Sequence, residues 1–106
     1  MAKRRRTVYR IEYAPEAEAH LAGLTKREAT TILDTVPRQL GHQPTLVTRN
    51  RKPLEANPVA PWELRIGDLR VYFDVVEEIE HVVRIVAVGR KERERVLIGG
   101  VEVKLR

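Results

Sequence analysis

The segment from Trp62 to Phe73 constrains this chain more than any other, because its residue types alternate along two runs that flank a turn. Gly67-Asp68 is typical of a two-residue β-hairpin turn, with glycine at the position that takes a positive φ. With these two residues in the turn, the predicted hairpin pairs Ile66 with Leu69, Arg65 with Arg70, Leu64 with Val71, Glu63 with Tyr72, and Trp62 with Phe73. Each strand then has one apolar face and one polar face.

The polar face of this predicted hairpin places two arginines directly opposite each other. It consists of Glu63, Arg65, Arg70 and Tyr72. Like charges at opposed positions of a sheet are unfavourable, so a strand pair selected only for stability has little reason to keep Arg65 and Arg70 together. A phosphate changes that balance, because a guanidinium group binds phosphate oxygens in pairs. The pair therefore predicts an anion site.

The other two residues of the polar face each have two interpretations. Glu63 is either a proton acceptor in a reaction or a surface partner that neutralises a neighbouring arginine. Tyr72 either stacks on a nucleic-acid base or packs on the sheet. Trp62 is expected in the core.

Ahead of the hairpin, the pattern predicts one strand and two helices. Residues 7–13 alternate as a strand does, and Pro15 begins a short helix that ends near residues 21–24. Thr25 and Glu28 have the spacing of a capping box. They open a second helix with one apolar stripe, which consists of Ala29, Ile32, Leu33, Val36 and Leu40.

The end of that second helix is open to two interpretations. Pro37 removes a helical hydrogen bond, so it is expected either to kink the helix or to end it near Val36. Gly41 is expected to end any part of the helix that continues beyond Pro37. Residues 42–61 show no periodicity and predict a long loop with a basic cluster, Arg49-Asn50-Arg51-Lys52, as a candidate contact for a nucleic-acid backbone.

The second half of the chain predicts further antiparallel strands. The hairpin strands are expected near residues 61–66 and 69–76, and an acidic turn leads to an apolar strand over 81–88. The register of that turn leaves the face of Arg84 undetermined. A small hairpin is expected to turn at Gly99-Gly100. The predicted fold class is α+β: an N-terminal strand, an αα-hairpin, and an antiparallel meander sheet covered on one face by the helices.

The composition of the chain favours some kinds of binding partner over others. The chain has 106 residues, so it predicts a single domain over 7–106 after a basic arm, residues 1–6, that is expected to be disordered. Twenty Lys and Arg residues against 15 Asp and Glu residues give a net charge of +5, which favours a polyanionic partner, although charge also serves solubility. There is no cysteine, and the three histidines lack metal-ligand spacing, so no metal or cofactor is expected. The sequence shows neither the apolar region of a secretory signal nor an apolar run long enough to span a membrane, so we expect a cytoplasmic protein.

Taken together, these pieces resemble the RelE/ParE toxin superfamily of type II toxin–antitoxin systems. The resemblance runs from about Val8 to Glu94 and rests on Lys52-Pro53-Leu54, the block Arg65–Phe73, and residues 86–93 with their Gly-Arg-Lys sequence. It implies a small basic toxin bound by a cognate antitoxin. The RelE branch implies a ribosome-dependent endoribonuclease that cuts mRNA, and the ParE branch implies an inhibitor of DNA gyrase.

The resemblance also implies roles for individual residues. Arg70 and its cross-strand partner Arg65 correspond to groups that hold the scissile phosphate, and Arg90 and Lys91 correspond to the basic pair after the glycine. The RNA-binding candidates are Arg49, Arg51, Lys52, Tyr72 and Arg93. The chain departs from the RelE pattern at two positions: Leu97 stands where the best-known enzymes have tyrosine, and Glu63 stands where they have lysine.

The chemistry expected of such a site needs no metal. The RNA 2′-hydroxyl attacks the adjacent phosphate, while arginines stabilise the charge that develops there. Glu63 is the first candidate for the base and Lys91 the second. Three hypotheses remain at this point: an mRNA-cleaving toxin, a gyrase inhibitor that is not an enzyme, and a degenerate member that binds its antitoxin without cutting.

Overall fold

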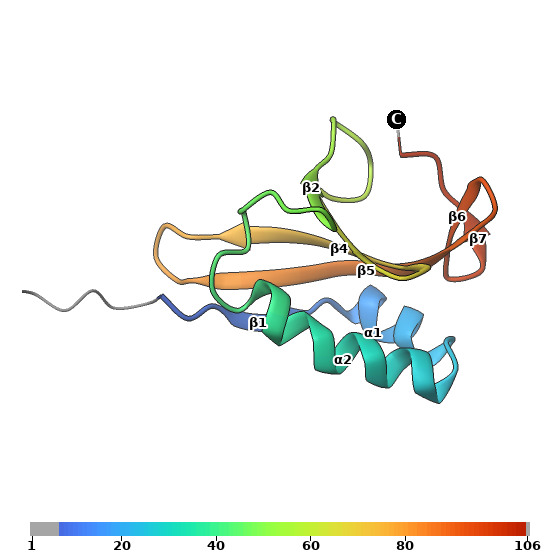
Figure 1. The fold of residues 1–106 in the computed structure, drawn as a ribbon, viewed down its shortest axis with the longest axis horizontal. Coiled ribbons are helices and arrows are strands. Elements are labelled where there is room, and N and C mark those ends of the chain that lie inside the picture. The colour runs from blue at the N-terminus through green and yellow to red at the C-terminus, as the bar shows by residue number, and fades with distance from the viewer. Residues whose placement is uncertain (1–6, 106) are drawn as a thin grey trace, which may run out of the picture.

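A computed structural model describes residues 7–105 as one sheet with two helices packed on it (Figure 1). The predicted basic arm, residues 1–6, lies outside the described residues, as does Arg106. The elements are β1 (Arg10–Tyr13), α1 (Pro15–Ala22), α2 (Lys26–Leu40), β2 (Arg51–Pro53), β3 (Trp62–Ile66), β4 (Leu69–Val76), β5 (Val82–Glu92), β6 (Arg95–Ile98) and β7 (Val101–Glu102).

The sheet is an antiparallel meander with one parallel addition. Strands β2 to β7 neighbour one another in chain order, and β1 pairs parallel with the first half of β5. Both helices lie on the same face of this sheet, while the loop after β2 and the C-terminal segment lie on the other (Figure 1). The predicted α+β fold class is confirmed.

The hairpin register is confirmed at all five positions. Trp62 pairs with Phe73, Glu63 with Tyr72, Leu64 with Val71, Arg65 with Arg70, and Ile66 with Leu69. Gly67 has a φ of 60°, the left-handed conformation that favours glycine in this turn. On the helix-facing side, the rings of Trp62 and Phe73 stack with their centroids 5.9 Å apart.

A capping box begins α2, and burial of its last turn decides where it ends. The Thr25 hydroxyl accepts a hydrogen bond from the Glu28 N–H (3.1 Å), and the Glu28 carboxylate accepts one from the Thr25 N–H (3.0 Å), which completes the predicted capping box. Of the two options for Pro37, an end near Val36 is wrong, because the helix continues through Pro37 to Leu40. Proline removes one hydrogen bond, whereas burial of Val36 and Leu40 holds the last turn on the sheet.

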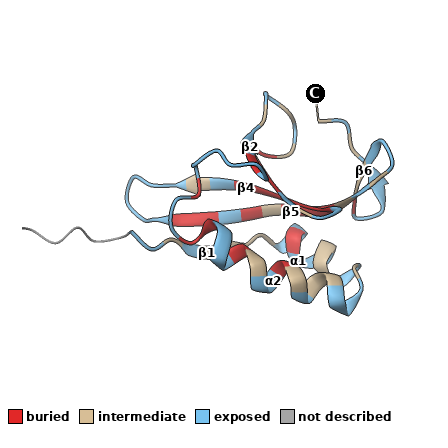
Figure 2. Cartoon of the chain, in the orientation of Figure 1, coloured by how far each residue is buried: buried red, intermediate tan, exposed pale blue. Residues whose placement is uncertain are grey.

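The main core lies between the helices and the sheet. Its buried residues are Ala17, Ile32, Val36, Leu40, Leu64, Leu69, Val71, Phe73, Val83, Ile85 and Val88. Figure 2 shows these buried positions along the strands and on the inner side of the helices. Leu33, which was predicted in the apolar stripe of α2, is 47% exposed.

Part of the predicted loop over residues 42–61 is a strand. β2 pairs antiparallel with β3, so that Arg51 lies opposite Leu64, Lys52 opposite Glu63 and Pro53 opposite Trp62. Three residues that end in proline carry too little periodicity to be recognised as a strand. This pairing matters because it brings Lys52 onto the sheet beside Glu63.

A β-bulge in β5 decides which of its residues face the helices. Tyr72 pairs with Ala87 but Phe73 pairs with Ile85, so Val86 is an extra residue between them. Val83 and Ile85 face the helices before the bulge, and Val88 does so after it. The alternation therefore shifts by one residue at Val86. Arg84, whose face the sequence left undetermined, pairs with Asp74 on the face away from the helices.

The C-terminal end forms the expected small hairpin. β6 and β7 pair through Ile98 and Val101, with Gly99 and Gly100 at φ values of 61° and 79° in the turn. Of the helices in residues 7–105, neither is long and apolar enough to cross a membrane.

The close approach of β6 to Gly89 generates a stability prediction. A Cβ atom at Gly89 would lie 2.4 Å from the Leu97 carbonyl oxygen and 2.8 Å from the Ile98 side chain. Gly89→Ala is therefore expected to destabilise the fold by about 2–3 kcal/mol, as overpacking does. Urea unfolding measures this change.

Gly23→Ala is the matched control, because its Cβ would meet its nearest neighbour at 3.5 Å, an ordinary contact. Its effect should stay within about 1 kcal/mol. Equal stability of the two variants would contradict the described packing of β6 on β5.

Candidate functional site

The face of the sheet opposite the helices carries two rows of side chains that cross several strands. One row runs through Lys52, Glu63, Tyr72 and Ala87. The next row runs through Arg65, Arg70, Gly89 and Ile98. These pairings bring residues from β2, β3, β4 and β5 onto one surface, which we call the basic face.

The two arginines at the centre of the basic face are held differently. Arg70 is 5% exposed, and its Nη1 donates to the carbonyl oxygens of Gly67 (2.8 Å) and Leu69 (2.9 Å). The Arg65 side chain is 45% exposed, and its Nε donates to the Glu63 carboxylate at 3.2 Å. The hairpin turn therefore orients Arg70, while Arg65 remains open to solvent and reaches a single acidic partner within the described chain.

Lys91 joins the basic face because of the bulge at Val86. Gly89 faces Arg70, and alternation along β5 puts Lys91 on the same side, where it is exposed. Its backbone N–H donates to the Asp68 carbonyl oxygen at 2.7 Å, which ties this part of β5 to the hairpin turn. Lys91 therefore lies on the same sheet face as Arg65, Arg70 and Glu63, at the end next to the hairpin turn.

Arg90, the other member of the predicted basic pair, points the opposite way. It pairs with Leu69, a core residue on the helix-facing side, and its Nη2 donates to both carboxylate oxygens of Glu28 in α2. A second carboxylate, Glu92, lies 3.6 Å from its Nη1. The structure therefore does not place Arg90 with Arg65 and Arg70; its guanidinium joins the sheet to the N-terminal turn of α2.

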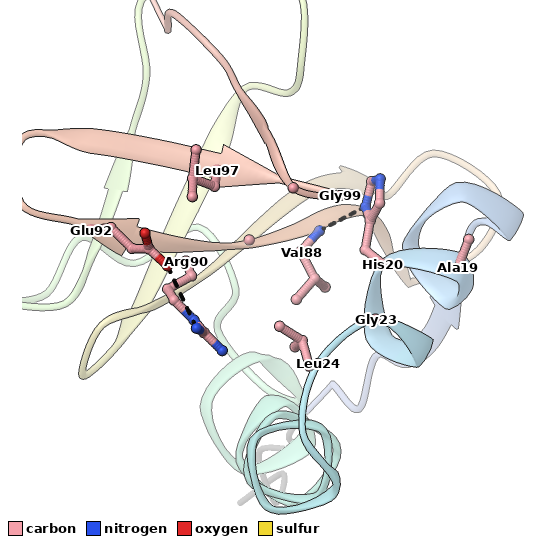
Figure 3. Close-up of a pocket in the computed structure, with 11 residues that line it drawn as sticks. Ala19, His20, Gly23, Leu24, Val88, Arg90, Glu92, Leu97 and Gly99 are labelled. Atoms are coloured by element: carbon pink, nitrogen blue, oxygen red, sulfur yellow. Dashed lines mark hydrogen bonds and ion pairs between the residues drawn. The ribbon is translucent and has the colours of Figure 1, made fainter.

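Arg90 and Leu97 line a cavity of about 350 Å³ between α1 and the β5–β6 pair (Figure 3). In its wall, the Nδ1 atom of His20 accepts a hydrogen bond from the Val88 N–H at 3.3 Å. Leu97 pairs with Arg90 and so belongs to the helix-facing side. The position at which the resemblance implies a tyrosine is therefore separated from the basic face by the sheet.

Glu63 and Tyr72 form the most buried part of the basic face. Glu63 is 4% exposed and Tyr72 is 0% exposed. Burial, followed by the neighbouring charge of Glu63, raises the pKa of the Tyr72 hydroxyl well above its ordinary range. Within residues 7–105, that hydroxyl has no hydrogen-bond partner. It is therefore a protonated donor close to the Glu63 carboxylate but without a well-formed hydrogen bond to it.

Tyr72 is buried by a second, smaller apolar cluster on this side of the sheet. With Ala60, Ala87 and Ile98 it forms the cluster's buried centre, against which Leu54, Val59, Val86, Val96, Val103 and Leu105 pack. The loop after β2 and the C-terminal segment supply most of this cover. The predicted stacking of a base on the Tyr72 ring does not fit this enclosure.

The predicted RNA-binding cluster separates into exposed and buried members. Arg49 and Lys52 are exposed, and so is Arg93, which adopts a φ of 59° in the turn between β5 and β6. Arg51 is 5% exposed, and its guanidinium donates to the carbonyl oxygens of Gln39, Gln43 and Leu46. Carbonyl oxygens occupy both terminal nitrogens of Arg51, whereas in Arg70 they occupy Nη1. Arg51 therefore holds the end of α2 and the following loop, and is not available to a phosphate.

Two residues that matter were missed by sequence reasoning. Gly89 allows β6 to approach β5 closely, and an isolated glycine within a strand pattern is a signal that could have indicated this. Asn57 organises the loop over the basic face: its side chain donates to the carbonyls of Glu55 and Ala60 and accepts from the N–H groups of Val59 and Ala60. An Asn-Pro sequence in a loop is a signal for such a turn.

Residues 7–105 contain no group of three or more His, Cys, Asp or Glu side chains that could hold a metal ion. Comparison with protein-family models and with curated proteins gave no match to this chain.

The buried position of Arg51 generates a second prediction. Arg51→Ala removes the donor to three carbonyl oxygens, so it is expected to lower the free energy of unfolding by about 2–4 kcal/mol. Chemical denaturation measures the loss. The neighbouring, exposed Lys52→Ala should change stability by less than about 0.5 kcal/mol. A larger effect at Lys52 than at Arg51 would contradict this assignment.

The contact between Glu28 and Arg90 generates a pH prediction. The Thr25 N–H, supported by Arg90 and opposed by burial, lowers the pKa of Glu28 below its ordinary 4.5. A carboxylate with a lowered folded-state pKa contributes stability above pH 4.5, and this contribution is lost as pH falls through the folded pKa.

Glu28→Gln should therefore destabilise the protein at pH 7, and the difference from wild type should shrink as pH falls below about 4.5. Thermal unfolding between pH 3 and 7 follows this difference. A difference that stays constant over that range would show that the Glu28 charge contributes nothing.

Proposed function

We propose that this protein belongs to the RelE/ParE toxin superfamily and is a ribosome-dependent mRNA endoribonuclease of the RelE type, silenced by a cognate antitoxin. The observation that carries the proposal is the convergence of Arg65, Arg70 and Lys91 with Glu63 on one sheet face. Two opposed arginines, one of them paired with a carboxylate, and a lysine on the same face form a surface suited to a phosphodiester. The order of the elements, which matches the family's expected fold, supports the same proposal.

The proposed reaction is an attack by the RNA 2′-oxygen on the adjacent phosphorus. The new 2′-O–P bond forms while the P–O5′ bond breaks, leaving a 2′,3′-cyclic phosphate and a 5′-hydroxyl. Arg70, preorganised by the turn carbonyls, and the more exposed Arg65 stabilise the phosphate charge, with Lys91 beside them. Glu63 accepts the proton from the 2′-hydroxyl.

The surroundings of the site support a nucleic-acid backbone as the substrate. Arg49, Lys52 and Arg93 are exposed on the β2 and β5 sides of the hairpin, where they extend the positive charge beyond the central pair. We assign the dependence on the ribosome from the family resemblance. An antitoxin would silence the protein by covering the basic face with an acidic segment, bound as a helix in a groove or as an added strand.

Two observations favour the alternative of a family member that does not cut RNA. Arg90 is engaged by Glu28 instead of joining the site, and Leu97 replaces the tyrosine that the resemblance implies. A gyrase inhibitor of ParE type, or a protein that only binds its antitoxin, would need neither group.

A translation assay separates these functions. Purified protein is added to a reconstituted translation reaction, and mRNA 5′ ends are mapped by primer extension, with the same mRNA lacking ribosomes as a parallel sample. Codon-spaced cuts that require ribosomes are the expected result. Intact mRNA in the presence of folded protein would reject the proposal, and gyrase supercoiling would then be assayed.

Variants in the same assay test the basic face directly. Arg65→Ala and Lys91→Ala remove exposed cations, so folding should be retained while cleavage falls by about 10²-fold or more. Arg70→Ala should abolish cleavage and leave antitoxin binding largely intact. Arg38→Ala, on the helix layer, is the charge-matched control and should cleave like wild type. Full activity of folded Arg65→Ala and Lys91→Ala would show that the reaction occurs elsewhere.

A further inference from the structure

The Tyr72 hydroxyl is a buried polar group without a partner. The residue is 0% exposed, and within the described chain no acceptor meets its hydroxyl at full hydrogen-bond geometry, although the Glu63 carboxylate is close enough to raise its pKa. Leaving a buried donor unpaired is unfavourable, so each such group calls for an explanation, of which a role in a reaction is one. Phenylalanine at this position would fill the same space without that cost.

The position of Tyr72 in the sheet indicates a chemical role for its hydroxyl. Tyr72 lies directly opposite Glu63 and one row from the Arg65–Arg70 pair, on the same face of the sheet. In the proposed cleavage Glu63 takes a proton while Arg65, Arg70 and Lys91 stabilise charge, so the proton that the leaving group needs is still unassigned. The 5′-oxygen departs as a strongly basic alkoxide unless it receives a proton.

We propose that the Tyr72 hydroxyl donates a proton to the departing 5′-oxygen, a role that rests on the function proposed above. As the P–O5′ bond breaks, the phenolic proton moves to the 5′-oxygen, which leaves as a hydroxyl. Glu63 meanwhile holds the proton taken from the 2′-hydroxyl. Because Glu63 is beside Tyr72, that proton then passes to the tyrosinate, and both groups return to their starting states.

The electrostatic surroundings of Tyr72 keep its hydroxyl protonated before the transfer. Burial and the Glu63 charge raise the pKa of Tyr72, so the phenol carries its proton throughout the neutral range. Arg70 and Arg65 lie close enough to favour the tyrosinate that forms after transfer, since both lower the pKa of Tyr72 against the other effects.

Access to Tyr72 requires part of its cover to move. The loop over 54–60 is held by four hydrogen bonds of the Asn57 side chain. The C-terminal segment, which contributes Val103 and Leu105, is held beyond β7 by a single backbone bond, from the Val103 N–H to the Val96 carbonyl (2.9 Å), among the described residues. The C-terminal segment is therefore the part of the cover that substrate displaces.

The test uses a leaving group that needs no proton. Ribosomes are loaded with mRNA carrying one cut site, in which the bridging 5′-oxygen is either kept or replaced by sulfur. Tyr72→Phe should cut the oxygen substrate about 10²- to 10⁴-fold more slowly than wild type, the usual contribution of a proton donor. It should cut the sulfur substrate at nearly the wild-type rate, because a thiolate leaves without protonation.

Tyr13→Phe is the matched control. Tyr13 also has a buried hydroxyl with no partner in residues 7–105, but it packs against the helix-facing core. It should cut both substrates like wild type. Both variants should be at least as thermally stable as wild type, because each loses an unsatisfied polar group.

Each other outcome rejects the inference in a recognisable way. Equal rates for Tyr72→Phe and wild type on the oxygen substrate would show that the hydroxyl is not used. Equal slowing of Tyr72→Phe on both substrates would assign Tyr72 a role in packing. No cleavage of the oxygen substrate by wild type would reject the proposed function itself, and the role of Tyr72 with it.

Discussion

The Gly67-Asp68 turn sets the register in which β3 and β4 pair, and the other elements of the structure depend on that register. It puts Leu64, Leu69, Val71 and Phe73 against the helices and leaves Arg65 opposite Arg70 on the other face. A slip of one residue would exchange the two faces and remove the core. The turn therefore determines at once what holds the helices and where the positive charge gathers. The apolar face fixes this register, and the register places the like charges of Arg65 and Arg70 at directly opposed positions.

The bulge at Val86 has a comparable effect on β5. Without the extra residue, strict alternation from Val83 and Ile85 would turn Lys91 toward the helices and Arg90 toward the basic face. With it, Lys91 joins Arg65 and Arg70, while Arg90 binds Glu28 and secures α2. One inserted residue thus places the neighbouring cations Arg90 and Lys91 on opposite faces of the sheet. Arg51 likewise serves the fold, because its guanidinium donates to carbonyl oxygens of the loop that follows α2 and does not belong to the basic face.

Sequence reasoning recovered the hairpin, the capping box, both helices and the final Gly99-Gly100 turn, because each follows from short-range pattern. It missed β2, whose three residues form a strand through pairing with β3. It also ended α2 too early as one option, because the effect of Pro37 was weighed without the burial of Leu40. Of the candidate site residues, Glu63, Arg65, Arg70, Lys91 and Lys52 lie on one sheet face, while Arg51 and Arg90 serve the fold.

Local alternation and turn chemistry were sufficient to predict the order of the strands and helices, and with it the fold class. They also predicted the opposed arginines, because that pairing depends on residues within one hairpin. Only the tertiary structure decided that Lys91, and not Arg90, lies on the same face as those arginines. It also decided that Tyr72 is buried in an apolar cluster against which Val103 and Leu105 pack. A bulge shifts the face of every residue beyond it without leaving a clear mark in the residue types. Enclosure of a side chain depends on segments that are distant in the chain, so no local pattern contains it.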